Sequence, residues 1–275
     1  MHADALFEEA ATALRANRVA EARTLFGEAG AAGRHDAAVI HCNLTASGGD
    51  WANGMRLLAE LARTDPRCRR QFELIRTMDL SATLRGEVVS EAPHLTLFPS
   101  LFTHEECLYL VEAATPMLAP SVVVDPATGA QRPDPVRLSD SAGFTLPLEN
   151  PAVHALNQRL AAASGTGWGQ GEPLQVLRYR PGGEYKPHFD AIPGFANQRI
   201  LTMIVWLNED YAGGETLFMK TGAKVKGRTG DALLFRNALP DGRRDPESGH
   251  AGLPVTQGEK LIASRWIRAR PFELA

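Results

Sequence analysis

The hydrophobic and polar positions follow two periodicities along the chain, and the change comes near residue 85. In the first part, apolar side chains recur every three or four residues, as at Leu6, Ala10 and Leu14. This spacing places them on one face of an amphipathic helix. Glycines such as Gly33 and Gly49 follow the helical stretches, as is typical of helix ends. The pattern predicts a small all-α domain over residues 1–85.

Two of these helical stretches are similar to each other. VAEARTLFGEAG at 19–30 and WANGMRLLAELA at 51–62 are offset by 32 residues and share small residues, a Leu-containing pair and a following Glu and Ala. Such a period is typical of helical-hairpin repeats of the tetratricopeptide or Sel1 kind. A plain amphipathic bundle packed on the next domain explains the same pattern. Pro66 marks one end of a further helix that we expect over 67–78.

From residue 86 onward the pattern is that of short strands. Apolar runs alternate with turns that contain Gly, Pro, Asn or Asp. Two helices interrupt them: Thr103 and Glu106 form a capping box before the apolar run that ends at 114, and Pro151 opens a helix over 151–163. The expected strands cover 94–102, 121–125, 174–180, 184–189, 200–207, 216–219, 231–236 and 260–268.

Many short strands with few helices favour a β-sandwich or barrel, with the helices covering one face. We therefore expect an α+β chain, divided into a helical domain over 1–85 and a β-rich domain over 86–275.

Composition and charge exclude several classes of function. The 275 residues carry a formal net charge of −3, which offers no broad basic field for nucleic acid or an anionic membrane. The three cysteines are widely spaced and form no CxxC, which argues against a disulfide framework and a cysteine zinc site. The first residues lack the basic and apolar pattern of a secretory signal, and no apolar run reaches the length of a membrane span. A cytoplasmic protein is expected.

The stretch PGGEYKPHFDAI at 181–192 contains the first pair of candidate metal ligands. On a strand, residues two apart project from the same face, so His188 and Asp190 point the same way. A histidine and a carboxylate on one face supply two of the three ligands of the facial triad found in non-haem Fe(II) oxygenases. Alone, this pair is a weak signal, because a surface histidine and an aspartate in a turn explain it more often.

A third candidate ligand and a lysine lie downstream. His250 is followed ten residues later by Lys260, after an expected turn over 255–258. Lys260 then begins a strand that can run beside the segment leading from His250. A buried lysine needs an anionic partner. A dicarboxylate could chelate iron at its 2-oxo-carboxylate end and place its distal carboxylate on Lys260. Taken alone, Lys260 fits a solvated surface lysine as well.

Ordered motifs in the C-terminal part of the chain resemble the prolyl 4-hydroxylase family of Fe(II)- and 2-oxoglutarate-dependent dioxygenases. The strand leading into the HxD pair is followed by a Gly-Gly-Glu-Thr turn, a hairpin and the distal His, Lys and Trp. The helix LFTHEECLYLVEAA at 101–114 resembles the one that opens the family's catalytic domain. The four other matching segments are LQVLRYRPGGEYKPHFD (174–190), RILTMIVWLNEDYAGGETLF (199–218), VKGRTGDALLFRN (225–237) and SGHAGLPVTQGEKLIASRWIR (248–268).

The resemblance implies a double-stranded β-helix (jelly roll) with supporting helices, and a catalytic set of His188, Asp190, His250 and Lys260. It implies Fe(II) as the metal, 2-oxoglutarate and O2 as co-substrates, ascorbate as reductant, and succinate and CO2 as products. Its further implied roles are metal binding by His188, Asp190 and His250, 2-oxoglutarate binding by Lys260, Tyr179 and Thr202, a position near the active site for Trp266, and substrate contact by Arg137 and Ser139.

The chain departs from the family pattern in a short segment between Asp190 and Thr202, where many relatives carry a longer loop. Arg243 and Arg244 lie in DGRRDPESGH, which is either a solvated loop or a contact for an acidic substrate. The expected reaction is hydroxylation of a prolyl residue in a protein or peptide docked by the N-terminal helices. Alternatives are hydroxylation of a free amino acid or other small molecule, and a helical-repeat interaction protein whose oxygenase domain does not turn over.

Overall fold

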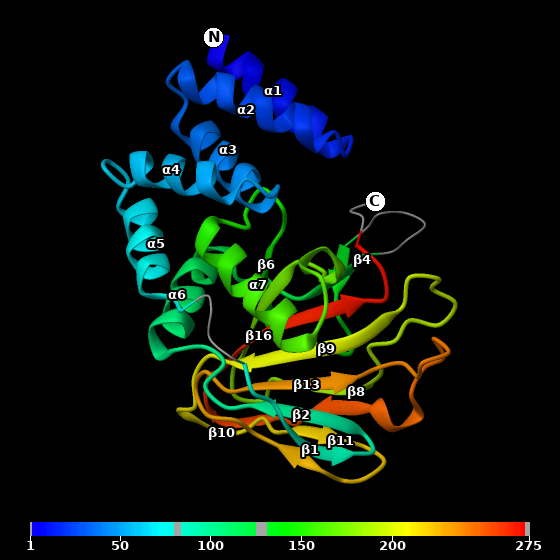
Figure 1. Cartoon of the computed structure of the whole chain (residues 1–275). Helices are drawn as coiled ribbons and strands as arrows, with labels where there is room; N and C mark the ends of the chain where they lie inside the picture. The colour runs from blue at the N-terminus through cyan, green and yellow to red at the C-terminus, as the bar shows by residue number, and fades with distance from the viewer. Residues whose placement is uncertain (1, 80–83, 125–130, 273–275) are drawn as a thin grey trace. The chain divides into compact units, whose positions relative to one another are not determined.

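The computed structural model describes residues 2–79, 84–124 and 131–272, and its contacts divide the chain into two compact units. One unit contains the N-terminal helices together with Phe144–Arg159. The other contains residues 84–143 and Leu160–Phe272. Figure 1 shows the helices at the start of the chain and the strands of the later part.

Five consecutive helices make up most of the first unit, and each contacts the next one along the chain. Gly33 and Gly49 adopt the left-handed conformation after α2 and α3, which glycine tolerates without strain. The side chains of Asp50 and Asp65 cap α4 and α5, and Pro66 lies in the first turn of α5. The helices are α1 His2–Arg15, α2 Val19–Ala31, α3 His35–Ser47, α4 Trp51–Leu61 and α5 Pro66–Thr77.

A segment from much later in the sequence completes this helical unit. Asn43 Nδ2 donates a hydrogen bond of 2.9 Å to the carbonyl oxygen of Pro147, and Leu146 packs against the core around Phe26. The Trp51 and His154 rings lie 5.9 Å apart. The segment continues into α7, Pro151–Ser164, so the sequence correctly predicted a helix opening at Pro151.

The second unit is built from antiparallel strands in two main sheets. The larger sheet has the order β1-β2-β13-β9-β16-β7-β6-β3, and the smaller has the order β12-β11-β14-β8; β10 pairs with β15 and β4 with β5. The strands are β1 Glu87–Glu91, β2 His94–Phe98, β3 Ala119–Pro120, β4 Val122–Val124, β5 Gln131–Pro133, β6 Asp140–Phe144, β7 Leu174–Tyr179, β8 Tyr185–His188, β9 Arg199–Trp206, β10 Tyr211–Gly213, β11 Thr216–Phe218, β12 Lys224–Val225, β13 Ala232–Arg236, β14 His250–Gly252, β15 Val255–Gly258 and β16 Lys260–Arg268.

The core lies where side chains of the two sheets meet. Phe218 from the smaller sheet and Phe235 from the larger one are fully buried, with ring centroids 5.4 Å apart. Leu177, Trp206 and Ile262 join the same cluster. Two antiparallel sheets closed over one apolar core form the expected jelly roll.

Helix α6, His104–Ala114, begins at the predicted capping box. Thr103 Oγ1 accepts from the Glu106 amide at 3.2 Å, and the Glu106 carboxylate accepts from the Thr103 amide at 2.8 Å. Cys107 and Leu110 on this helix are fully buried. Short 3-10 turns occur at Thr115–Met117, Trp168–Gln170 and Pro246–Ser248. None of the helices in the described ranges is both long and apolar enough to cross a membrane.

Two expectations about local structure were wrong. Residues Val255–Gly258 are not a turn but strand β15, because their backbone pairs with β10, which has no apolar run to reveal it. Strand β8 ends at His188, so Asp190 lies beyond the strand, although its side chain still reaches the same point as His188. The run expected over 121–125 forms β4, and residue 125 lies outside the described residues.

Candidate functional site

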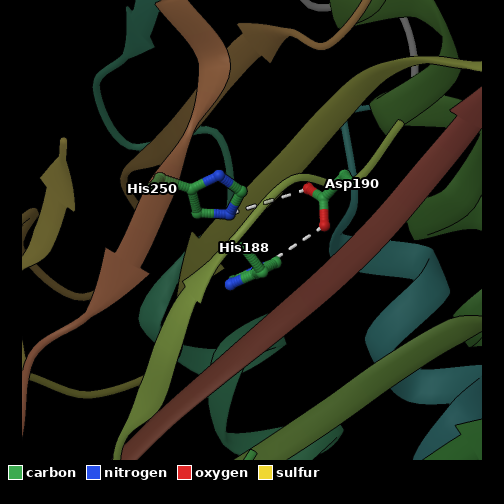
Figure 2. A group of neighbouring side chains, drawn as sticks. All are labelled: His188, Asp190 and His250. Carbon is green, nitrogen blue, oxygen red and sulfur yellow. Dashed lines mark ion pairs between the residues drawn. The ribbon is translucent and has the colours of Figure 1, made fainter. Parts of the chain in front are cut away.

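Three side chains that were singled out in the sequence converge in the β unit. The ligand atoms of His188, Asp190 and His250 all lie within 4.8 Å of one another, and Figure 2 shows the side chains gathered around one point. The pairing of β8 with β14 sets His188 directly opposite His250, with ring centroids 4.3 Å apart. Asp190 reaches the same point from the bend that follows β8.

The two imidazoles are oriented for metal binding. Each Nδ1 lies within hydrogen-bond distance of a backbone carbonyl, at 2.8 Å from Lys186 O for His188 and 2.9 Å from Ser248 O for His250. Donation from Nδ1 leaves both Nε2 atoms as acceptors. The buried Nε2 of His188 has no hydrogen-bond partner, since its distance to Asp190 Oδ1 is 3.5 Å. A divalent cation bound by both Nε2 atoms and the carboxylate fits this donor set.

Asp190 is held as an anion in a buried place. Burial by itself would raise its pKa, but His250, His188 and the Thr202 hydroxyl together hold the pKa well below its usual range. Thr202 Oγ1 donates to Asp190 Oδ2 at 2.6 Å and accepts from Asn237 Nδ2 at 2.7 Å. Burial also lowers the pKa of His250, which favours the neutral imidazole that a metal requires.

Lys260 lies in the wall of the same cavity. It is 3% exposed, stands opposite Tyr179 in the β16–β7 register, and places Nζ 5.4 Å from the Tyr179 ring centroid. Nζ donates to Gly214 O at 2.6 Å. Burial lowers the pKa of Lys260 to about 8, although the Glu215 carboxylate opposes the shift. Lys260 and His250 thus reach one cavity from opposite sheets, not from neighbouring strands as the sequence suggested.

Apolar side chains make up part of the cavity wall. Leu177, Ile204 and Ile262 line the cavity that also contains the metal cluster and Lys260, together with Thr202 and Trp266. Trp266 pairs with Thr202 in the β16–β9 register.

Sequence reasoning missed Tyr185 and Asn237. The Tyr185 ring stacks on His188 with centroids 3.5 Å apart, and it lines the cavity. Tyr185 opens the short strand that carries His188. The available signal was therefore an aromatic residue shortly before the HxD pair. Asn237 is fully buried and follows β13 directly; a polar residue after an apolar strand was the only signal for it.

Arg137 and Ser139 do not line the cavity that holds the triad. They line a separate hollow with Asp134, Arg178 and other residues. The backbones of Arg137 and Tyr185 nevertheless form an isolated antiparallel β-bridge, and the Arg137 guanidinium lies 5.6 Å from the Tyr185 ring centroid. The Ser139 hydroxyl lies 2.9 Å from that of Ser121.

The part of the chain that contains the site is similar to known oxygenases. Residues 174–268 match the family model of the 2OG-Fe(II) oxygenase superfamily. The chain is 36% identical over 206 residues to prolyl 4-hydroxylase 1 of Arabidopsis thaliana, covering 68% of this chain and 73% of that protein. It is 33% identical over 193 residues to prolyl 4-hydroxylase subunit alpha-1 of Gallus gallus, covering 66% of this chain and 37% of that protein.

A solved structure supports the same fold. The viral collagen prolyl hydroxylase from Paramecium bursaria Chlorella virus-1, in complex with 2OG, superposes with a TM-score of 0.52 at 29% identity. The match covers 66% of this chain and 99% of the viral one.

Proposed function

This chain belongs to the prolyl 4-hydroxylase family of Fe(II)- and 2-oxoglutarate-dependent dioxygenases, and we propose that it hydroxylates a prolyl residue in a protein or peptide. The enzyme uses Fe(II), 2-oxoglutarate and O2, and it releases succinate and CO2. The observation that carries the proposal is one cavity with the His188–Asp190–His250 cluster on one side and the buried Lys260 in its wall.

In this proposal His188, Asp190 and His250 hold the iron. When bound, Fe(II) supplies the redox chemistry that couples decarboxylation of 2-oxoglutarate to oxidation of a C–H bond. The carbonyls of Lys186 and Ser248 fix the two imidazole rings, so that both Nε2 atoms face the metal position. Thr202 holds one carboxylate oxygen of Asp190 through its hydroxyl.

Lys260 receives the distal carboxylate of 2-oxoglutarate. An ammonium group buried among apolar side chains is costly unless an anion pairs with it, and its lowered pKa reports that cost in the free protein. The co-substrate removes the cost by supplying the missing negative charge. Tyr179, opposite Lys260 in the register, forms part of the same co-substrate pocket together with Thr202.

The prolyl residue is held beside the metal by aromatic side chains. Tyr185 stacks on His188 and Trp266 lines the same cavity, so two flat apolar surfaces are available to a pyrrolidine ring. Arg137 and Ser139 contact the substrate chain outside the cavity, where Arg137 lies close to Tyr185.

The helical unit is proposed to dock the substrate polypeptide. A hollow on α2, α3 and α4 is lined by Arg23, His41 and Asn53, which offer polar groups to a peptide chain. The functional division is residues 1–85 for docking and 86–275 for catalysis. Ascorbate serves as the reductant. We place the enzyme in the cytoplasm, in keeping with the buried free thiols of its three cysteines.

Mass spectrometry of proline-containing peptides tests the proposal. Peptides incubated with the purified protein, Fe(II) and 2-oxoglutarate are expected to gain the mass of one oxygen atom on a prolyl residue. Asp190→Ala protein serves as the control, and free L-proline as a second substrate arm. Oxidation of free L-proline but of none of the peptides would contradict the proposal.

A further inference from the structure

A second hollow lies outside the iron cavity on the same β unit. One wall is the segment 192–198, which joins the Asp190 bend to β9, and the other is the turn 241–244 between β13 and β14. Ile192, Phe195, Arg243 and Arg244 are among its lining residues. The segment 192–198 lies in the connection between Asp190 and Thr202, which we expect from the sequence to be short.

Hydrogen bonds hold the 192–198 wall in place without a ligand. The Gln198 side chain accepts from the Ile192 amide at 2.8 Å and donates to the Ile192 carbonyl at 2.7 Å, which closes the segment into a loop. Asn197 Oδ1 accepts from the Arg270 amide at 2.9 Å.

The opposite wall is also ordered. The Leu239 amide donates to Arg243 O at 2.8 Å, and Ala238 forms a β-bridge with Arg244. Two fixed walls make this hollow a groove that exists before any partner binds, which lowers the entropic cost of binding.

Exposed rings lie beneath arginine side chains in the groove and beside it: Phe195 lines the groove, and Phe189 adjoins it through Arg244. Phe189 is 37% exposed, and the Arg244 guanidinium carbon lies 4.0 Å from its ring centroid. Phe195 is 55% exposed, and Arg268 lies 5.2 Å from its ring centroid. Exposed aromatic rings at ordered positions are typical of binding surfaces.

The charge of the groove is positive, although the whole chain carries a net charge of −3. Arg243 pairs with Asp241 at 2.6 Å, so that carboxylate is already neutralised. Within the described part of the chain, Arg244 has neither a carboxylate partner nor a side-chain hydrogen bond; its one contact of note is the Phe189 ring. An exposed, uncompensated guanidinium over an aromatic ring fits a carboxylate ligand.

Phe189 connects the groove with the metal site. It lies between His188 and Asp190, and its ring packs so closely on Gly249 that a Cβ there would approach it to 3.0 Å. Gly249 directly precedes His250. Through Arg244, the groove therefore contacts a residue that lies between two of the proposed ligands.

We propose that this groove, formed by residues 192–198 and 241–244 beside Phe189, binds an acidic segment of the substrate polypeptide that flanks the hydroxylated residue. Arg244 pairs with one carboxylate, and Arg243 shares its guanidinium between Asp241 and a second one. Phe189 and Phe195 contact apolar side chains between them. Only the flanking role of the acidic segment rests on the proposed function. Binding of an acidic peptide to the groove is measurable without turnover.

Fluorescence anisotropy on the full chain, without added iron, tests the binding. The probes are three labelled peptides with one central proline and flanks of Glu and Asp, of Gln, or of Lys. The acidic peptide is expected to bind roughly tenfold more tightly than the Gln peptide, as two partly exposed ion pairs allow. The doubly substituted variant R243E and R244E is expected to lose this preference and to favour the Lys peptide. Arg228→Glu, an exposed change outside the groove, serves as the matched control.

Two results would overturn the inference. One is unchanged affinity of the acidic peptide for the doubly substituted variant. The other is competition by oligodeoxythymidine as strong as that by unlabelled acidic peptide, which would show a site for any polyanion. In turnover assays, the variant should raise KM for the acidic peptide and leave kcat and the KM for 2-oxoglutarate unchanged. Prolyl hydroxylation that does not depend on the charge of the flanks would contradict this inference but not the proposed function. Charge-dependent binding without prolyl hydroxylation would contradict the proposed function but not this inference.

Discussion

At the scale of single residues, the site buries charged groups whose interactions are incomplete in the free protein. Asp190 is 4% exposed and Lys260 is 3% exposed, and they line one cavity. The nearest polar contact of Lys260 Nζ is a backbone carbonyl, and the buried Nε2 of His188 has no hydrogen-bond partner. These incomplete interactions are what a metal and a dicarboxylate would complete.

Replacement of Lys260 by Ala separates the two ligands. A buried charge pair is worth about 3 kcal/mol, so the KM for 2-oxoglutarate is expected to rise roughly 100-fold. The iron content should stay near that of the wild type, because Lys260 is not part of the metal cluster. Steady-state kinetics and metal analysis of the same preparation give both values. Equal loss of iron would show that Lys260 has a structural role.

The same lysine predicts a pH dependence. Burial lowers its pKa from the ordinary 10.5 to about 8 in the free protein, and only the ammonium form pairs with a carboxylate. The KM for 2-oxoglutarate should therefore be constant well below pH 8 and rise above it, by up to roughly tenfold per pH unit. Lys260→Arg, which stays charged, should abolish the rise. A wild-type KM that stays flat up to pH 9.5, about 1.5 units above that pKa, would contradict the assignment.

The same pKa shift affects the stability of the ligand-free protein in the opposite direction: as pH rises, stability increases while binding of 2-oxoglutarate weakens. Between about pH 8 and 10.5 the unfolded chain holds this proton and the folded chain does not. The contribution of Lys260 to the free energy of unfolding therefore increases with pH across this window. Urea unfolding at several pH values, compared with Lys260→Ala, measures the difference.

At the scale of elements, the site depends on strand register. The β8–β14 pairing places the two histidines opposite each other, and the β16–β7 pairing does the same for Lys260 and Tyr179. Without knowledge of which strands pair, the sequence could predict β7, β9, β13 and β16 from their apolar runs, and α6 from its capping box. It could not place Asp190 beyond β8 or detect β15, because backbone pairing between strands that are distant in sequence leaves no local pattern.

The contact between Thr202 on β9 and the residue that follows β13 supports the metal site. Thr202 links Asn237 to Asp190, so Thr202→Val should weaken iron binding by roughly 10- to 100-fold without unfolding the protein. Thr216→Val is the matched control, since Thr216 is buried in the same cavity wall and is not bonded to Asp190. Iron titration compares the two. Equal losses in both variants would mean that cavity polarity, and not the hydrogen bond, determines affinity.

At the scale of the whole molecule, chain order does not reveal which parts pack together. The segment Phe144–Arg159 lies between strands of the β unit in sequence and belongs to the helical unit in space. Nothing in its composition indicates this, because its partners Asn43 and Trp51 are about 100 residues away. The side chains that line the metal cluster and its cavity, in contrast, were recognisable as a set from their order and spacing.

A truncated chain that starts at residue 84 tests this packing. It keeps every residue of the metal cluster but removes the partners of Leu146, Pro147 and His154. We expect it to bind iron and to melt at a lower temperature than the full chain. Calorimetry and metal analysis give the two results. An unchanged melting temperature would show that the helical unit contributes nothing to the stability of the rest.

Heavy-isotope dioxygen shows directly whether the protein couples 2-oxoglutarate turnover to hydroxylation of a prolyl residue. The protein is supplied with Fe(II), 2-oxoglutarate, labelled O2 and a proline-containing peptide, and both products are examined by mass spectrometry. We expect one labelled oxygen atom in succinate and one on the prolyl residue, with neither in Asp190→Ala protein. Label in succinate with none in the peptide, or no 2-oxoglutarate turnover at all, would contradict this expectation.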